Sequence, residues 1–245
     1  LMKDIQSQID HRRIDIKKVG VKTITYPITV LDKSQKSQKT IATVNMYVNL
    51  PHHFKGTHMS RFIEILNRFH GQVDLKRFRL ILEEMKDRLD AEAAHIEITF
   101  PFFLHDTGGG DEFQVRKYDC AMHCLLEEEE DLRLDILVPV AHPFTGHSLS
   151  GDSGAVGLWG NVSVSARFNK FMWLEDLIGV VEETISKESS EGNKINAAQK
   201  PMESLLESLV NRFDELLELK WYSITVENIS QGYSLFATIS STDTP

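Results

Sequence analysis

The chain has 245 residues, enough for one large domain or for two of about 120 that each bury a core. Hydrophobic residues at 41% and charged residues at 26% are typical of a globular protein, and a net charge of −9 argues against broad nucleic-acid binding. Because no run of 18 apolar residues is present and the first residues are polar, we expect no membrane span, no signal peptide and a cytoplasmic location.

The first half of the chain predicts two strands, two helices and two more strands. Residues 23–31 and 40–49 alternate between apolar and polar side chains around a polar loop, as in a β-hairpin. Residues 58–70 and 74–93 have the apolar periodicity of amphipathic helices. The stripe of the second helix consists of Leu75, Phe78, Leu82, Met85 and Leu89. A further hairpin starts at residues 96–104.

The returning strand of that hairpin carries both cysteines, Cys120 and Cys124. A Cys-x-x-x-Cys spacing with an intervening His could suggest a metal site. However, Tyr118, Met122 and Leu126 share the even spacing of the cysteines, which indicates the apolar face of a strand. We therefore expect the two thiols to be buried as small hydrophobic groups.

The second half repeats the same order. Strands are predicted at 132–140, 162–168, 221–228 and 233–240, and helices at 173–187 and 201–218. Each half thus reads strand, strand, helix, helix, strand, strand (ββααββ), which is an α+β architecture with antiparallel sheets and helices on one face. The predicted organisation is an N-terminal arm (1–22), a first unit (23–127) and a second unit (128–245).

A possible anion site lies where the first hairpin meets the first helix. Residues 53–62 place Lys55, His58, Ser60 and Arg61 around Gly56. Backbone N–H groups at a helix N-terminus and nearby cationic side chains suit a phosphate or carboxylate. The alternative is an ordinary helix start with a threonine N-cap and a surface arginine. The residue types alone leave both interpretations open.

The same stretch, from Pro51 to Phe62, resembles the signature of the type IB GTP cyclohydrolases. Further segments resemble that family, namely Asp10–Arg13, Val19–Lys22, Tyr26–Ile28, Ala94–Glu97, Phe100–Phe103, Trp221–Tyr222 and Val226–Asn228. The resemblance implies two tandem tunnelling-fold units and a homo-oligomer, a dimer or a tetramer whose sheets join in a ring. It also implies a GTP or pterin ligand, Zn or Mn as cofactor, and conversion of GTP to 7,8-dihydroneopterin triphosphate and formate, the first step of folate and pterin biosynthesis.

The chain departs from the family at the positions that the resemblance assigns to the metal. The family has two Cys and two His at or near these positions, with a Glu. In this chain the first Cys position, also the expected catalytic one, holds Phe144, and the other ligand positions hold Val156, Ser230 and Tyr233. None of these is a usual ligand for a divalent ion, so no metal site and no catalytic residue can be assigned.

Two hypotheses follow from this departure. Ligands that have moved to His142, His147 and Asp152 would allow an active GTP cyclohydrolase, although solvated loop residues are the simpler explanation of those three. Lost ligands would leave a catalytically silent paralogue that binds a nucleotide or pterin, or a structural or regulatory subunit of a ring. In either case Lys55, His58, Ser60 and Arg61 are the candidate ligand-binding residues.

Overall fold

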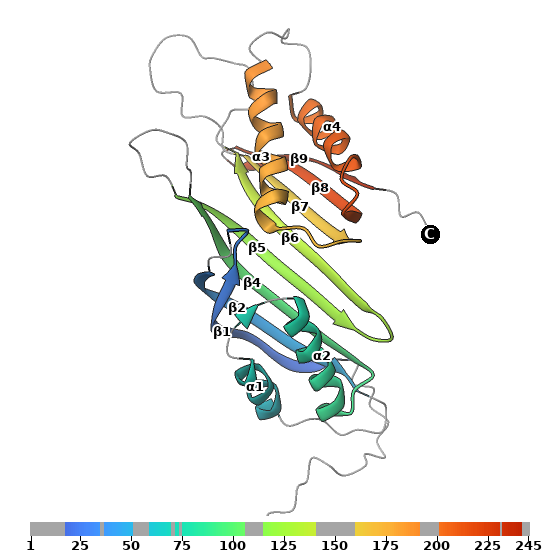
Figure 1. Cartoon of the computed structure of the whole chain (residues 1–245). Coiled ribbons are helices and arrows are strands. Elements are labelled where there is room, and N and C mark those ends of the chain that lie inside the picture. The colour runs from blue at the N-terminus through green and yellow to red at the C-terminus, as the bar shows by residue number, and fades with distance from the viewer. Residues whose placement is uncertain are drawn as a thin grey trace, which may run out of the picture. The chain divides into compact units, whose positions relative to one another are not determined.

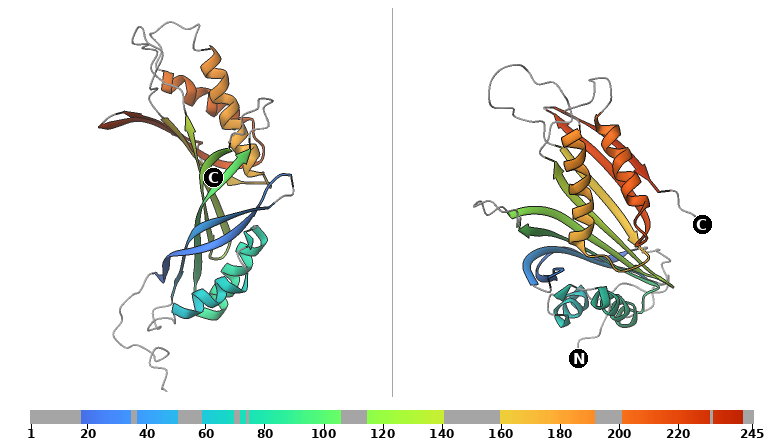
Figure 2. Two further views of the ribbon diagram at one scale, coloured as in Figure 1. Left: turned by 90° about the vertical axis from the view of Figure 1, so that its left-hand side faces the viewer. Right: turned by 45° about the horizontal axis from the view of Figure 1, so that its top comes forward.

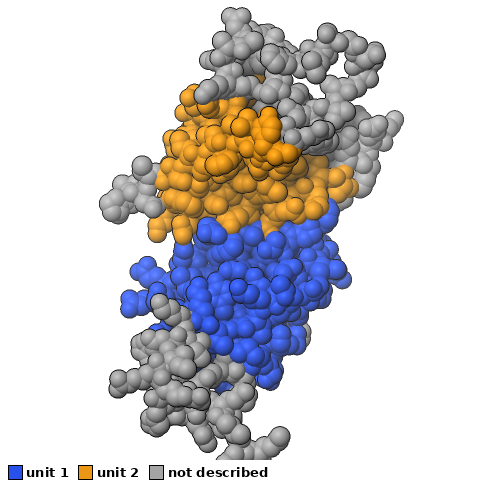
Figure 3. All heavy atoms as spheres, turned by 180° about the vertical axis from the view of Figure 1, so that it is seen from behind, with its two compact units in different colours: residues 1–103, 121–133 blue, residues 104–120, 134–245 orange. Residues whose placement is uncertain are grey.

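The computed structural model describes residues 18–34, 37–50, 59–69, 72–73, 75–105, 115–140, 160–191, 201–230 and 232–241. The chain divides into two compact units, which are coloured separately in Figure 3. Unit 1 comprises residues 1–103 and 121–133, and unit 2 comprises residues 104–120 and 134–245. The strands β5 (Val115–Leu126) and β6 (Glu130–Val140) therefore contribute residues to both units.

Unit 1 is built on a small sheet whose strands follow the order β3-β1-β2-β4. Its elements are β1 (Val19–Leu31), β2 (Ser37–Asn49), α1 (Met59–Arg68), β3 (Gln72–Val73), α2 (Leu75–Leu89) and β4 (Ala93–His105). The pairs β1–β2 and β2–β4 are antiparallel, whereas the short β3 pairs with β1 in parallel. The two helices lie together on one face of these strands (Figures 1 and 2).

The core of unit 1 lies between that face and the helices. Every second residue of β2 from Ala42 to Val48 is buried, and the apolar stripes of α1 and α2 supply the other side of the core. The fully buried members include Val44, Met46, Phe62, Leu82 and Met85. The residues between them on β2 and β4 are half-buried or exposed and belong to the opposite face, which we call the helix-free face.

A β-bulge in β1 allows both ends of this strand to bury apolar side chains. Val21 pairs with Met46 and Ile24 pairs with Val44, so Lys22 and Thr23 together lie opposite Asn45. The register shift moves the core-facing positions from odd residue numbers before the bulge to even numbers after it. Thr23 has a φ of 57°, a conformation that is costly for a β-branched residue.

Unit 2 repeats the arrangement. It contains β7 (Gly160–Phe168), α3 (Leu174–Glu191), α4 (Pro201–Asp214), β8 (Leu219–Ser230) and β9 (Tyr233–Ser240). Its strands β7, β8 and β9 are neighbours in that order and pair antiparallel. Both helices lie on one face of these strands, and Leu177, Ile178, Leu209 and Phe213 are buried against them (Figure 1).

The predicted α+β architecture of two ββααββ units is confirmed, and several predicted boundaries move. The predicted second helix, 74–93, ends at Leu89, because Ala93 and Ala94 instead begin β4 and pair with Asn49 and Val48. The first strand starts at Val19, four residues before its predicted start. Within the described part of the chain, we find no helix that combines the length and the hydropathy needed for a membrane span.

Candidate functional site

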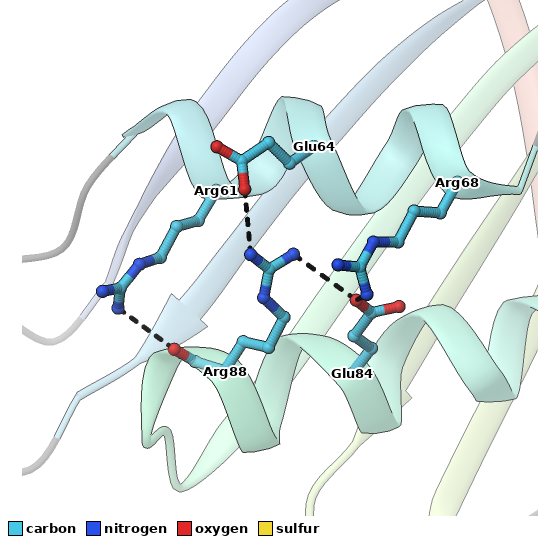
Figure 4. A network of polar contacts seen from close by, with 5 residues as sticks. All are labelled: Arg61, Glu64, Arg68, Glu84 and Arg88. Carbon is cyan, nitrogen blue, oxygen red and sulfur yellow. Dashed lines mark hydrogen bonds and ion pairs between the residues drawn. The ribbon is translucent and has the colours of Figure 1, made fainter.

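The predicted anion segment is described only from Met59 onward, so Lys55 and His58 lie outside the described residues. Ser60 is exposed in the first turn of α1. The Arg61 guanidinium donates a hydrogen bond of 3.2 Å to the backbone carbonyl of Arg88, in the last turn of α2 (Figure 4). Arg61 thus joins the start of α1 to the end of α2, and its role toward an anion stays a prediction.

Charged side chains continue this contact between the two helices. The Arg88 guanidinium contacts Glu64 at 2.9 Å and Glu84 at 3.5 Å, and Arg68 contacts Glu84 at 2.5 Å (Figure 4). Ion pairs that are partly exposed in this way contribute less than about 1 kcal/mol each. We conclude that this network orients α1 against α2 and offers no binding site of its own.

The helix-free face of unit 1 carries a second polar network, centred on Glu97 in β4. The Tyr47 hydroxyl donates to Glu97 Oε1 at 2.7 Å, and Asn45 Nδ2 donates to Glu97 Oε2 at 3.0 Å. Burial alone would raise the pKa of Glu97. The hydrogen bonds from Tyr47 and Asn45, with the charges of His123 and Lys22, outweigh burial and hold this pKa below its usual value. Glu97 is therefore a stable carboxylate anion at neutral pH.

The Tyr47 ring is enclosed between two other groups. His95 stacks on it with ring centroids 4.5 Å apart, and the Lys18 ammonium lies 4.6 Å from its centroid. Burial and the Lys18 charge lower the pKa of His95, so its imidazole is neutral at pH 7, and burial with the Glu97 contact raises the pKa of Tyr47 to about 12. These contacts hold the Tyr47 ring in place beside Glu97.

The network also reaches the bulge in β1. The Thr23 backbone N–H donates to Asn45 Oδ1 at 2.8 Å, so both ends of the Asn45 amide are used. The strained Thr23 is thus tied through Asn45 to the Glu97 carboxylate. Because its hydrogen bonds run between strands of the same sheet, this network acts on the register of β1, β2 and β4.

The end of the β8–β9 hairpin contains the two predicted metal-ligand positions that fall in described residues. Ser230 and Tyr233 are register partners there, and Tyr233 is 63% exposed. Two residues earlier in β8, Asn228 is only 6% exposed, and its Oδ1 has no hydrogen-bond partner. This end of β8 therefore has an unused buried polar group next to the positions singled out from the sequence.

The described residues do not fit the metal that the resemblance implies. Hydroxyl side chains are poor ligands for Zn²⁺ or Mn²⁺. Within the described ranges, no group of three or more His, Cys, Asp or Glu side chains could hold a metal ion. Phe144, Val156, His142, His147 and Asp152 lie outside those ranges.

The two cysteines behave as expected from their spacing. Cys120 and Cys124 are free thiols with 1% and 3% exposure, and burial raises the pKa of each to about 12. The two thiols therefore stay protonated at neutral pH and pack as small hydrophobic groups.

Comparison with known proteins decides the family. Residues 2–195 match the sequence profile described as "Type I GTP cyclohydrolase folE2". The chain belongs to this family. It is 43% identical over 239 residues to the GTP cyclohydrolase FolE2 of Syntrophus aciditrophicus, which covers 93% of this chain and 94% of that protein. It is also 38% identical over 256 residues to the FolE2 of Syntrophobacter fumaroxidans, which covers 97% and 98% of the two chains.

Solved structures support the fold alone. The uricase of Arthrobacter globiformis superposes with a TM-score of 0.52 at 10% identity and covers 91% of this chain and 92% of its own. The urate oxidase of Bacillus subtilis 168 gives a TM-score of 0.54 at 8% identity, with coverage of 91% and 98%.

The sequence analysis did not identify the Glu97 network or Asn228 as functional groups. The Glu97 network has a visible signal, since Asn45 and Tyr47, and likewise His95 and Glu97, are polar at a spacing of two in otherwise apolar strands. Asn228 has the corresponding signal, because it follows Ile224 and Val226 on the buried face of β8. Only the register of the strands identifies which of these polar groups have partners.

Proposed function

We propose that this FolE2 family member acts on GTP and converts it to 7,8-dihydroneopterin triphosphate and formate. The observation that carries the proposal is the 43% identity to a GTP cyclohydrolase FolE2 over 93% of the chain. Hydrolysis at C8 of guanine requires an activated water, which the family supplies with a bound Zn or Mn. No described residue of this chain fits that metal, so we derive no step through it.

A specific observation favours a second candidate, a catalytically silent paralogue that keeps a nucleotide or pterin site. The chain has no cysteine after Cys124, and it has Ser230 and Tyr233 where the family has Glu and His. Relocation of the ligands to His142, His147 and Asp152 would restore the first proposal. Loss of all ligands would make the protein a binding or regulatory subunit of a ring.

One experiment separates the two candidates. We would measure GTP turnover with added Zn²⁺ or Mn²⁺ by pterin fluorescence after oxidation, and quantify bound metal on the same sample. Turnover with stoichiometric metal supports the enzyme. Binding of GTP or neopterin without turnover and without metal supports the silent paralogue, and absence of any binding contradicts both.

A multiple substitution tests the mapping of the ligand positions. Installing the family's residues together should create a metal site, measured by metal content after dialysis. The variant combines Phe144→Cys, Val156→His, Ser230→Glu and Tyr233→His. A folded variant that binds no metal would show that the mapped positions are wrong.

We also propose that the protein is a homo-oligomer, a dimer or tetramer, which places β9 in a subunit interface. Tyr233, Leu235, Phe236 and Ile239 on this strand are 63%, 56%, 68% and 40% exposed, although they are large and apolar. Among the described strands, β9 has β8 as its only neighbour, so its outer edge is open for pairing. Light scattering of Phe236→Lys should show a smaller species than the unmodified protein. Equal mass for the variant and the unmodified protein would exclude the outer edge of β9 from the subunit interface.

The remaining expectations concern location and ligand class. Two unpaired, buried cysteines fit a reducing compartment, and we therefore place the protein in the cytoplasm. The net charge of −9 supports a small-molecule ligand and no nucleic-acid partner. Under this proposal the phosphates of the ligand are bound by Lys55, His58, Ser60 and Arg61. The local positive charge of these residues must then outweigh the repulsion from the protein's net negative charge.

A further inference from the structure

Asn228 occupies a core position in β8 that an apolar side chain would fill at lower cost. It follows Tyr222, Ile224 and Val226 at the two-residue spacing of a strand, and these are 5%, 0% and 0% exposed. Asn228 itself is 6% exposed, and its Oδ1 accepts no hydrogen bond. A buried polar atom without a partner destabilises the folded state, so the fold carries a side-chain carbonyl that it does not use.

The same chain shows how an asparagine is used when its role is structural. Asn45 in β2 accepts from the Thr23 N–H and donates to Glu97, with distances of 2.8 and 3.0 Å. Asn169, before α3, donates to the Leu219 carbonyl at 3.1 Å. The Asn49 Oδ1, at the end of β2, also has no partner, but Asn49 is only half-buried, whereas Asn228 is 6% exposed and its partner is not part of the described fold.

The register of the strands gives the neighbours of Asn228. Its partner in β7 is Gly160, which has no side chain, and its partner in β9 is Leu235. Two residues further along β8 is Ser230, paired with Tyr233, where the family has metal ligands. Asn228 thus lies at the end of the hairpin to which the sequence assigns the chemistry.

We propose that Asn228 is a ligand-binding residue whose side-chain carbonyl accepts a hydrogen bond from a ring N–H or amino group of the bound guanine nucleotide or pterin. The ligand supplies the hydrogen bond that the fold omits. Guanine and pterin share an amino-oxo-pyrimidine edge that carries such donors, so one acceptor serves both. The inference rests on the proposed function, because it names a residue of the same site.

The test uses a matched pair of substitutions in the full-length protein. Asn228→Leu keeps the approximate volume and removes the unpaired amide, whereas Asn45→Leu removes an amide with two partners. We would measure the dissociation constants of GTP and neopterin by calorimetry, and the melting temperature of each protein without ligand. We expect Asn228→Leu to melt at the same or a higher temperature and to bind about ten- to a hundredfold more weakly. We expect Asn45→Leu to melt lower and to bind as the unmodified protein does.

Each other outcome overturns the inference. Unchanged binding of GTP and neopterin by Asn228→Leu would mean that the Asn228 side chain makes no hydrogen bond to the ligand. A lower melting temperature together with weaker binding would assign Asn228 a structural role. Asn228→Asp keeps an acceptor oxygen, so weak binding by a folded Asn228→Asp would also count against the hydrogen bond. If the unmodified protein binds neither GTP nor neopterin, the proposed function fails as well. This result is distinct from a failure of the inference alone, in which the unmodified protein still binds and only the effect of Asn228→Leu is missing.

Discussion

Asn45 in unit 1 and Asn228 in unit 2 are the same residue type in strands of similar units, yet their surroundings differ. Both ends of the Asn45 amide are hydrogen-bonded, to a strained backbone N–H and to an ionised carboxylate. The Asn228 carbonyl is buried and has no partner. The difference assigns the Asn45 amide to the architecture of unit 1 and leaves the Asn228 carbonyl available for the ligand that we propose.

The difference extends to the two sheets around these residues. In unit 1 the polar network lies on the helix-free face and includes Tyr47, His95 and Glu97. In unit 2, Asn161 and Glu227 are register partners, as Asn45 and Glu97 are in unit 1, but Ser163 and Thr225 replace the stacked aromatic pair. We therefore expect the polar face of unit 1 to stabilise the fold, and the end of unit 2 to carry ligand chemistry.

The largest expected effect comes from removing the Asn45 amide, which is hydrogen-bonded at both ends. Asn45→Leu leaves the Thr23 N–H and one Glu97 oxygen without partners, and should lower the free energy of unfolding by about 2–3 kcal/mol. Urea denaturation measures this value. The control is Thr43→Leu, an exposed position on the same strand, which should change it by less than about 0.5 kcal/mol. Equal effects at both positions would refute a structural role for the network.

The next effect is the dependence of stability on pH. The folded pKa of Glu97 lies below its unfolded value of about 4.3, so its contribution is complete above that pH and is lost as pH falls through the folded pKa. His95, whose pKa is lowered by burial, adds an earlier loss below about pH 6.5, where only the unfolded chain takes up its proton.

Thermal melts between pH 8 and pH 3 test this dependence. The melting temperature of Glu97→Gln should lie below that of the unmodified protein at neutral pH, and the gap should close in acid. His95→Gln should remove only the loss near pH 6.5. A gap that stays constant down to pH 3 would show that the charge of Glu97 does not contribute.

A smaller effect concerns the strain at the bulge. Thr23→Gly relieves a positive φ that costs an L-residue about 1–2 kcal/mol, and should raise the free energy of unfolding by about 1 kcal/mol. Thr25→Gly, two residues further in the regular part of β1, should lower it, because glycine weakens an ordinary strand. Equilibrium urea unfolding of both variants measures the two signs, and a loss for Thr23→Gly would mean that the bulge carries no strain.

The smallest effect is expected in the helix pair of unit 1. Glu64→Gln removes one ion pair of Arg88, and should cost less than about 1 kcal/mol and vanish in high salt. Denaturation at low and high ionic strength measures it. A large, salt-independent loss would make the charge network more than a surface contact.

Local patterns in the sequence predicted much of this fold, because they arise from burial on one face. The alternation of Val44, Met46 and Val48 and the helical stripe from Phe78 to Leu89 identify their elements with no knowledge of the partner. The start of β1 was not predictable in the same way. Val19 and Val21 are out of phase with Ile28 and Val30, and only the bulge opposite Asn45 reconciles the two.

The candidate site also has features that the sequence predicted and features that only the tertiary structure revealed. The sequence by itself determined the two ββααββ units and the buried cysteines, because residue types and their period carry that information. The mapping of the family's ligand positions onto Phe144, Val156, Ser230 and Tyr233 stays a prediction. Only the tertiary structure decided that Arg61 contacts the end of α2, that Asn45 has two partners and that Asn228 has a free carbonyl. Hydrogen-bond satisfaction depends on which strands pair and in what register, and that pairing joins residues far apart in the chain.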